Sequence, residues 1–115
     1  MNVSTLASDT RGEGVCVEIG GKEYLVFTLN KGKYRGGEIH CVTQHTVCLR
    51  GKIQVTLKEE TEKTLELTEG CILLINAGTP HLFYGEENSV FLEWKDGAPN
   101  TQYYAPYRSI VEGQQ

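Results

Sequence analysis

The chain has 115 residues, of which 39% are hydrophobic and 23% charged, so it is long enough for one globular domain with its own core. A formal net charge of −4 argues against a general nucleic-acid binder or a protein of anionic membranes, because both need a basic face. No stretch approaches the roughly 18 apolar residues of a membrane span, and residues 1–11 lack the apolar core of a signal peptide. We therefore expect a cytoplasmic protein with a flexible N-terminal arm over residues 1–12 and a single domain over residues 13–112.

Strand patterns separated by turn residues follow one another along the chain. Two β-branched or aromatic runs, 15–19 and 22–29, flank Gly20-Gly21 and predict a hairpin, because both glycines accept positive φ. Gly36-Gly37 permits a bend in the strand that follows. Further strands are predicted over residues 34–40, 47–49, 53–57, 64–68, 71–75, 81–83 and 90–94.

The sequence contains no convincing helix. Segment 57–67 is rich in Glu, Lys and Leu, but its apolar residues lack helical spacing, so we predict a charged loop over 58–63 followed by a strand. The continuous apolar run 71–75 predicts a strand that is buried on both faces. Many short strands with turns between them indicate an all-β barrel or double sheet, and this pattern alone fits a sandwich or a lipocalin-like barrel equally well.

The four cysteines show no Cys-x-x-Cys pair and lie in strand-like runs, where free cysteine packs as a small hydrophobic residue. An even number permits two disulfides, but the absence of a signal peptide favours reduced thiols. Cys48 has the strand parity to face inward as a nucleophile. Its position between Val47 and Leu49 favours packing instead.

Three polar side chains are concentrated in residues 35–51. Glu38, His40 and Gln44 stand at spacings of two and four, so on one extended strand all three point to the same face. A carboxylate, an imidazole and an amide make a poor hydrophobic core but a suitable wall for a metal or a polar substrate. His45 has the opposite parity and is expected to face outward.

Two motifs resemble those of the cupin superfamily. Glu38-x-His40-x3-Gln44-x6-Gly51 resembles the first cupin motif, in which His-x-His is followed by Glu and then Gly. Gly70-x5-Asn76-x-Gly78-x2-His81 resembles the second motif, with Asn76 in place of the usual proline. The resemblance implies a double-stranded β-helix, or jelly-roll barrel. It also implies a metal site made of Glu38, His40, Gln44 and His81, in which carboxylate and neutral ligands have exchanged positions.

Two imidazoles and one carboxylate suit a divalent transition metal such as iron, nickel, manganese or zinc, with Gln44 as a weak fourth ligand. A single carboxylate leaves the ion with a net positive charge, able to polarise a carbonyl or bind an anionic oxygen. The first hypothesis is therefore a metal-dependent isomerase, dioxygenase or lyase that acts on a small oxygenated substrate, sugar- or keto-acid-like, inside the barrel.

A narrower resemblance favours a second hypothesis. Arg35-Gly36-x3-His40-x3-Gln44, followed by Cys48-Leu49-x-Gly51, is similar to the start of small cupin sugar-nucleotide 3,4-ketoisomerases. This resemblance implies a metal-free isomerase in which His40 matches the second histidine of a pair and is the base, while Glu38 replaces the first histidine and is its partner. It also places Arg35 near the substrate. A third hypothesis is a non-catalytic ligand-binding or sensor cupin.

The C-terminal tail contains three tyrosines, a proline and an arginine within residues 103–108. It either closes the barrel mouth over a ring-shaped ligand or packs on its own barrel or on a partner subunit, and we favour packing because tyrosine is apolar with a polar tip. Candidate substrate contacts are Tyr34, Arg35, Tyr103 and Tyr107. We also expect a homodimer that pairs through edge strands.

Overall fold

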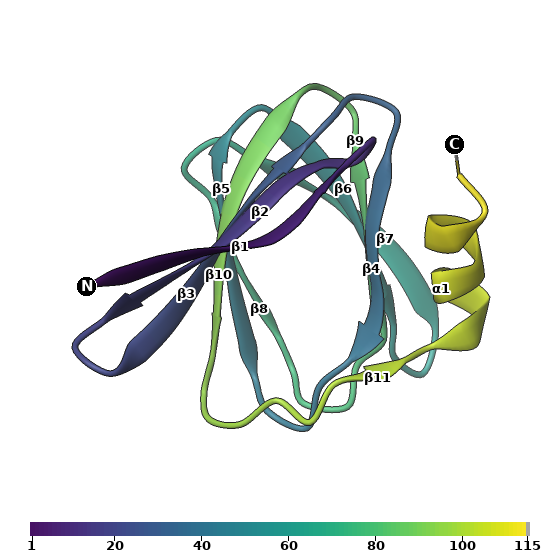
Figure 1. Ribbon diagram of the computed structural model, residues 1–115. Coiled ribbons are helices and arrows are strands. Elements are labelled where there is room, and N and C mark those ends of the chain that lie inside the picture. The colour runs from purple at the N-terminus through teal and green to yellow at the C-terminus, as the bar shows by residue number, and fades with distance from the viewer. Residues whose placement is uncertain (115) are drawn as a thin grey trace.

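A computed structural model describes residues 1–114 and shows two facing antiparallel sheets with a helix at the C-terminal end (Figure 1). The first sheet has the strand order β1-β2-β3-β10-β5-β8 and the second β11-β4-β9-β6-β7. The strands are β1 (Asn2–Asp9), β2 (Gly12–Ile19), β3 (Lys22–Leu29), β4 (Tyr34–Ile39), β5 (Gln44–Arg50), β6 (Lys52–Lys58), β7 (Glu62–Thr68), β8 (Ile72–Ile75), β9 (His81–Gly85), β10 (Ser89–Lys95) and β11 (Gln102–Tyr103). The all-β prediction is confirmed.

The core lies between the two sheets because alternate residues of the strands are apolar. On β6, Ile53, Val55 and Leu57 are buried, while the residues between them are polar and partly exposed. Phe91 joins the sheets by stacking on Phe27 of its own sheet and packing against Phe83 of the other. Burial of such side chains stabilises the fold by roughly 1.5–3 kcal/mol each.

The predicted hairpin is confirmed. β2 and β3 pair from Gly14–Phe27 to Ile19–Lys22. Gly20 and Gly21 form the two-residue turn, with φ values of 58° and 78°. Two positive φ values in sequence give the turn a twist that matches the flanking strands.

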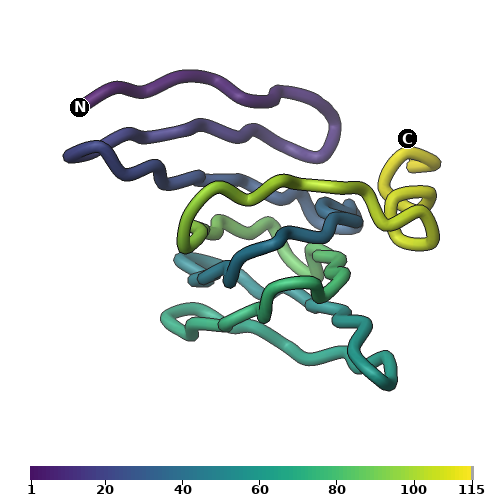
Figure 2. Tube along the Cα trace, turned by 90° about the horizontal axis from the view of Figure 1, so that it is seen from below, coloured from purple at the N-terminus to yellow at the C-terminus, as the bar shows by residue number. Residues whose placement is uncertain are grey.

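The expected N-terminal arm is instead a strand. Residues 2–9 form β1, which pairs along its whole length with β2 and shows one bulge between Thr5 and Ala7. Figure 2 shows it as the outermost of three adjacent strands at the N-terminal end of the chain. The polar composition of residues 2–9 hides this strand in the sequence, because β1 is an edge strand with exposed side chains.

The run 71–75 is also placed differently from the prediction. β8 lies at the edge of the six-stranded sheet, where Ile72 and Leu74 point outward and are exposed, while Ile75 is buried. In β8, the continuous apolar sequence therefore corresponds to an edge strand with an apolar outer face, which no other part of the described chain covers.

The C-terminal tail forms a helix, α1 (Ala105–Glu112), which the sequence analysis did not predict. Pro106 stands in the first turn, where its missing N–H is tolerated. Tyr107 and Val111, one turn apart, pack on Leu82 at the outer face of the five-stranded sheet. The tail thus packs on its own barrel. No helix within residues 1–114 is long and apolar enough to cross a membrane.

Candidate metal centre

A β-bulge places two cavity residues on the same side of β4. Arg35 pairs with Phe83 and Gly36 with Leu82, but the next pair joins Glu38 to His81, so the register shifts by one residue. Strict alternation would put Arg35 and Glu38 on opposite faces, and the extra residue restores a common face. Both side chains line the same cavity.

Gly37 provides the conformation that this bulge needs. Its φ is 72°, and a Cβ atom at this position would lie 2.7 Å from the backbone nitrogen and Cα of Arg108 in α1. Glycine is required both for the positive φ and for the close approach of the helix. The Gly36-Gly37 pair therefore positions the site, as the sequence indicated.

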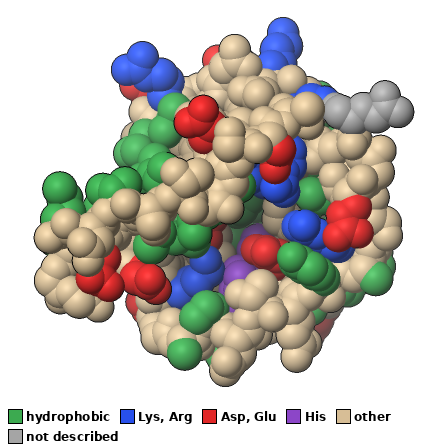
Figure 3. Space-filling view, viewed as in Figure 1, with side chains coloured by type: hydrophobic (Ala, Val, Ile, Leu, Met, Phe, Trp, Pro, Cys, Tyr) green, Lys and Arg blue, Asp and Glu red, His purple; other side chains and the backbone are tan. Residues whose placement is uncertain are grey.

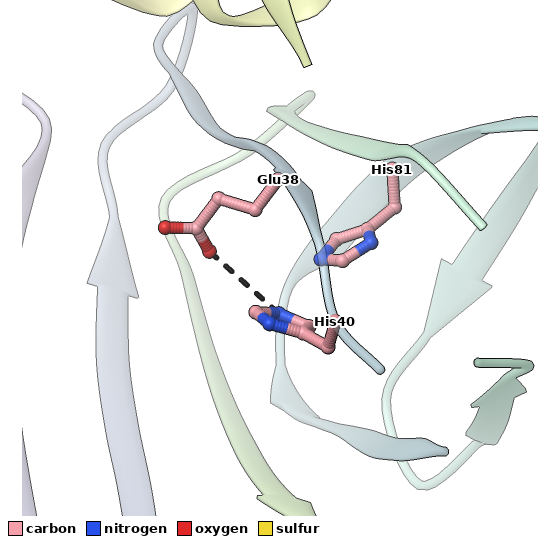
Figure 4. Close-up of side chains that lie close together, drawn as sticks. All are labelled: Glu38, His40 and His81. Carbon is pink, nitrogen blue, oxygen red and sulfur yellow. Dashed lines mark ion pairs between the residues drawn. The ribbon is translucent and has the colours of Figure 1, made fainter. Parts of the chain in front are cut away.

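Glu38, His40 and His81 converge inside the barrel (Figure 4). One potential ligand atom from each residue lies within 4.8 Å of the other two. The His40 Nε2 atom is 3.8 Å from Oε1 of Glu38, and the two imidazole ring centroids are 5.0 Å apart. These separations leave room for one cation among the three side chains.

Hydrogen bonds on the far side of each imidazole orient the two rings. The His81 Nδ1 atom lies 3.1 Å from the backbone oxygen of Thr79, and a carbonyl only accepts, so Nδ1 carries the proton and Nε2 has a free lone pair. The Nδ1 atom of His40 lies 2.9 Å from the hydroxyl of Thr101. Metal-binding histidines are usually fixed through the second ring nitrogen in this manner.

Burial keeps both imidazoles neutral. His40 and His81 are only 3% and 1% exposed. Desolvation lowers the pKa of His40 to about 3, with further lowering by His81 and Lys95. Desolvation also lowers the pKa of His81, and it raises the pKa of Glu38, to which the nearby Glu93 carboxylate contributes. A divalent cation would relieve this desolvation by accepting both lone pairs and the carboxylate.

Two buried polar atoms at the site are suited to a bound cation. Nε2 of His40 and Oε1 of Gln44 have no hydrogen-bond partner among the described residues. Buried polar atoms in proteins are normally paired. The donor set, two imidazole nitrogens and a carboxylate, matches the preferences of divalent transition metals, so the residues present fit the expected metal.

Gln44 is a separate case, because the strand that was expected to carry residues 38, 40 and 44 is interrupted. β4 ends at Ile39, and β5 of the other sheet begins at Gln44. The side chain is buried nonetheless, and its Nε2 donates to the Thr46 hydroxyl over 3.0 Å. Gln44 therefore faces the interior from the opposite sheet, with its oxygen available to a cation or to substrate.

Glu38 and His40 line a cavity of about 360 Å³, and the His81 ring lies behind them, 5.0 Å from the His40 ring between centroids. Figure 3 shows histidine side chains at the bottom of a hollow, surrounded by acidic and basic side chains. Arg35 and Tyr103 line this cavity, as expected for candidate substrate contacts. Tyr34 and Tyr107 do not line it. They pack beneath α1 on the outer face of the sheet, where the Tyr107 hydroxyl donates to Glu62, so the fold does not bring them to this cavity.

Several residues that line the cavity were not predicted from the sequence. Glu93 and Lys95 of β10 form a buried ion pair of 2.6 Å and line the cavity. Both residues are an even number of positions from Phe91 on the same strand, and this spacing could have predicted that their charges face inward. Arg11 and Arg108 also reach the cavity. Thr101, the partner of His40, stands in an irregular segment and carries no sequence signal of its role.

The residues expected to lie outside the site do so. His45 faces outward and stacks on Trp94, with its Nε2 within 3.0 Å of Asp96. Cys48 is fully buried in the hydrophobic core, as packing predicts, and all four cysteines are free thiols. A larger hollow of about 630 Å³ near the β2–β3 turn adjoins the cavity at Leu25, Lys95 and Pro99 but contains none of the three metal-type residues.

Two facing antiparallel sheets around a cavity that holds histidine and glutamate define a jelly-roll barrel of the cupin type. No known family profile and no curated protein matches the sequence. Solved structures do match the fold, at low sequence identity.

The capsular polysaccharide assembling protein CapF from Staphylococcus aureus is 14% identical, with a TM-score of 0.76 over 90% of this chain and 32% of CapF. A deletion mutant of oxalate decarboxylase OxdC from Bacillus subtilis is 18% identical, with a TM-score of 0.79 over 94% of this chain and 32% of that enzyme. The chain thus spans about a third of each. CapF has been solved with the inhibitor 3-isopropenyl-tropolone, and the Bacillus enzyme has Mn(II) centres. These similarities establish the cupin fold.

Proposed function

We propose that the protein is a metal-dependent enzyme that acts on a small oxygenated molecule, sugar- or keto-acid-like, held inside the barrel. The observation that carries this proposal is the convergence of Glu38, His40 and His81 inside the barrel, with Nε2 of His40 unpartnered among the described residues. Iron, nickel, manganese and zinc all fit this donor set. The Mn(II) centres of the Bacillus neighbour make manganese a natural first choice for reconstitution.

In the proposed site, a bound divalent ion would supply Lewis acidity toward a carbonyl or an anionic oxygen of the substrate. The protein holds two neutral imidazoles and one carboxylate in place, so the ion would keep a net positive charge. Thr79 and Thr101 fix the orientation of the two rings. His40 and His81 are only 3% and 1% exposed, and low exposure to water strengthens electrostatic interactions.

Arg35 is the proposed contact for an anionic or strongly polar end of the substrate. Its side chain is only 5% exposed, its Nε donates to the Thr28 carbonyl over 3.2 Å, and its guanidinium lies 4.9 Å from the Phe27 ring centroid. Nη2 has no partner within the described chain. A buried N–H donor without a partner is suited to a ligand oxygen.

The other cations of the cavity already have partners. Arg11 is bonded to Asp9, Lys95 to Glu93, and Arg108 to Glu112 and the Gly36 carbonyl. Arg35 therefore offers the free donor. Tyr103 lies at the mouth of the cavity with the Arg108 guanidinium 4.2 Å from its ring centroid, and it is the proposed contact for a ring or hydroxyl of the substrate.

The metal-free ketoisomerase hypothesis requires His40 to abstract a proton. Desolvation lowers the pKa of His40 to about 3, which makes it a weak base in the metal-free protein. The same burial favours metal binding, because a lone pair that is not protonated is available to a cation. We therefore place the metal-dependent function first. A cytoplasmic location, in which the four thiols stay reduced, is part of the proposal.

The test is the metal content of the untagged protein, measured by plasma mass spectrometry. About one transition-metal ion per chain is expected. His81→Ala and Glu38→Ala should lose it, whereas the matched variant His45→Ala should retain it because His45 faces outward. Less than about a tenth of an equivalent, with no uptake of added manganese, iron, nickel or zinc, would refute the metal site. Sugar nucleotides would then be the first ligands to screen.

The sensor hypothesis would be favoured if the metal-loaded protein binds small carboxylates or sugars but does not convert them at any pH between about 5 and 9. Retained metal with loss of ligand binding in Arg35→Met would still place the ligand in this cavity. The turnover assay therefore tests catalysis, and the metal content together with ligand binding tests the site.

A further inference from the structure

On the outer face of the six-stranded sheet, a row of paired residues crosses every strand and is apolar on all of them except β1. Directly opposed residues of an antiparallel pair share one face. The ladder pairs connect, in strand order, Thr5, Val15, Val26, Leu92, Val47 and Ile72. Alternate residues such as Phe27 and Phe91 point into the core. This sheet is therefore apolar on both faces.

A second row lies beside the first and is partly aromatic. It connects Val3, Val17, Tyr24, Trp94, His45 and Leu74. The rings of Tyr24 and Trp94 meet edge to face with centroids 5.9 Å apart, and His45 stacks on Trp94 at 4.8 Å. Charged groups stand at the rim, where Lys22 lies over both aromatic rings and Asp96 bonds to His45. An apolar centre with a polar rim is the usual anatomy of a protein interface.

The outer face of the other sheet shows the contrast. Its uncovered part on β6 and β7 is polar, with the outward residues Lys52, Gln54, Thr56, Lys58, Thr64, Glu66 and Thr68. Its apolar part, around Tyr34 and Leu82, lies beneath α1. In the five-stranded sheet, outward apolar residues are thus covered. In the six-stranded sheet, Ile72 and Leu74 at the edge are 59% and 57% exposed, and the central apolar residues of the two rows are partly exposed.

The size of this face suits a dimer. Six strands spaced about 4.8 Å apart and about seven residues long span roughly 650 Å² in projection. A standard interface buries about 800 Å² of accessible surface on each partner, and accessible surface exceeds projected area. The charges lie at the rim, so the centre of the face offers no charge pattern that would select a different protein.

We propose that a second copy of this chain packs on this face, sheet against sheet, about a two-fold axis. Two copies of one sheet have the same twist, as do the two sheets of a β-sandwich, which pack about 10 Å apart. Leu92, at the centre of the first row, then meets the apolar centre of the partner's sheet. This arrangement differs from pairing through edge strands, since it leaves the free edges of β1 and β8 unpaired.

Sedimentation equilibrium of the full chain tests the proposal. The wild-type protein is expected at twice the chain mass, and Leu92→Glu and Ile72→Glu are expected to raise the dimer dissociation constant at least about 100-fold. Ile110→Glu is the matched control. Ile110 is an exposed isoleucine of α1, 43% exposed and remote from the face, so its substitution should leave the dimer intact.

Circular dichroism separates dissociation from unfolding. Ile72 is largely exposed in the single chain, so Ile72→Glu should keep the β spectrum of the wild type even if Leu92→Glu does not. A wild-type monomer at about 100 μM would overturn the proposal and leave the face to a different protein. A dimer that persists in folded Ile72→Glu and Leu92→Glu would also overturn it and return the interface to the strand edges.

Discussion

Glu38 of β4 lies directly opposite His81 of β9 in the antiparallel ladder that joins the two strands. Paired strands with one bulge, rather than a loop, therefore position two of the three side chains, Glu38 and His81. His40 follows immediately after β4, and its carbonyl accepts a hydrogen bond of 2.8 Å from the backbone N–H of Gly78, just before β9. The site is built on one strand pair, which explains why the two sequence motifs that contain these residues occur together.

Substitution of Gly37 should disturb both the bulge and the helix packed on it. We expect Gly37→Ala to lower the free energy of unfolding by at least about 1 kcal/mol more than Gly21→Ala does. Both glycines have positive φ, 72° and 78°, but a Cβ at Gly21 has no described atom within 4 Å, whereas one at Gly37 meets the Arg108 backbone. Urea denaturation of both variants measures the difference. Equal losses would mean that the helix moves away without cost.

The sequence predicted the strand framework well because turn chemistry and alternation act locally. Gly20-Gly21 required a tight hairpin, and β6 alternates polar and apolar residues along its whole length. β1 and α1 were missed because their stability comes from tertiary contacts. A helix of eight residues is too short to hold by itself and depends on burial of Tyr107 and Val111.

For the candidate site, motif spacing was informative, whereas strand parity was applied across residues that do not belong to one strand. His40 and His81 were identified from two motifs that the fold brings together. Gln44 was assigned to the strand of Glu38, although the chain leaves β4 at Ile39 and enters the other sheet. Parity relates residues only within one uninterrupted strand. The bulge at Gly36–Gly37 likewise breaks the alternation of side chains within β4, so parity does not relate Arg35 to Glu38.

Removal of the Thr101 hydroxyl should weaken metal binding without removing a ligand. Thr101→Val takes away the hydrogen bond of 2.9 Å to Nδ1 of His40, so the ring loses its fixed orientation. We expect metal affinity to fall about 10- to 100-fold, measured by competition with a chromophoric chelator. Thr64→Val, at a hydroxyl on the outer face of β7 that contacts Thr56, is the matched control and should change nothing. An unchanged affinity in Thr101→Val would show that other contacts orient His40.

Arg35 should affect stability and ligand binding in opposite directions. Its guanidinium is buried without an ionic partner, and burial lowers its pKa to about 10. Replacement by an apolar side chain of similar length relieves this desolvation, so Arg35→Met should raise the free energy of unfolding by about 1 kcal/mol. Arg108→Met, which removes bonds to Gly36 and Glu112, should lower it. Denaturation measures both variants.

The same Arg35→Met variant should no longer be protected by an anionic ligand. Pyruvate and acetate serve as probes of the free Nη2 donor, with acetamide as the neutral comparison. Wild-type protein should melt at a higher temperature in the presence of the two anions, and the variant should not. Equal protection of both proteins would place the anion elsewhere in the cavity.

Alkaline pH should loosen α1 through Tyr107. Burial, together with the hydrogen bond to Glu62, raises the pKa of Tyr107 above its ordinary value near 10. Below pH 10 the phenol is protonated in both the folded and the unfolded chain, so this contribution to stability is fully present. Above pH 10 the unfolded chain releases the proton more readily, and stability is lost as the pH rises toward the folded-state pKa.

Urea denaturation at pH 8 and near pH 11, with reductant present, should therefore show a steeper loss of stability in the wild type than in Tyr107→Phe. Tyr103→Phe, at an exposed tyrosine, should follow the wild type. If Tyr107→Phe loses stability as steeply as the wild type, another group controls the alkaline transition.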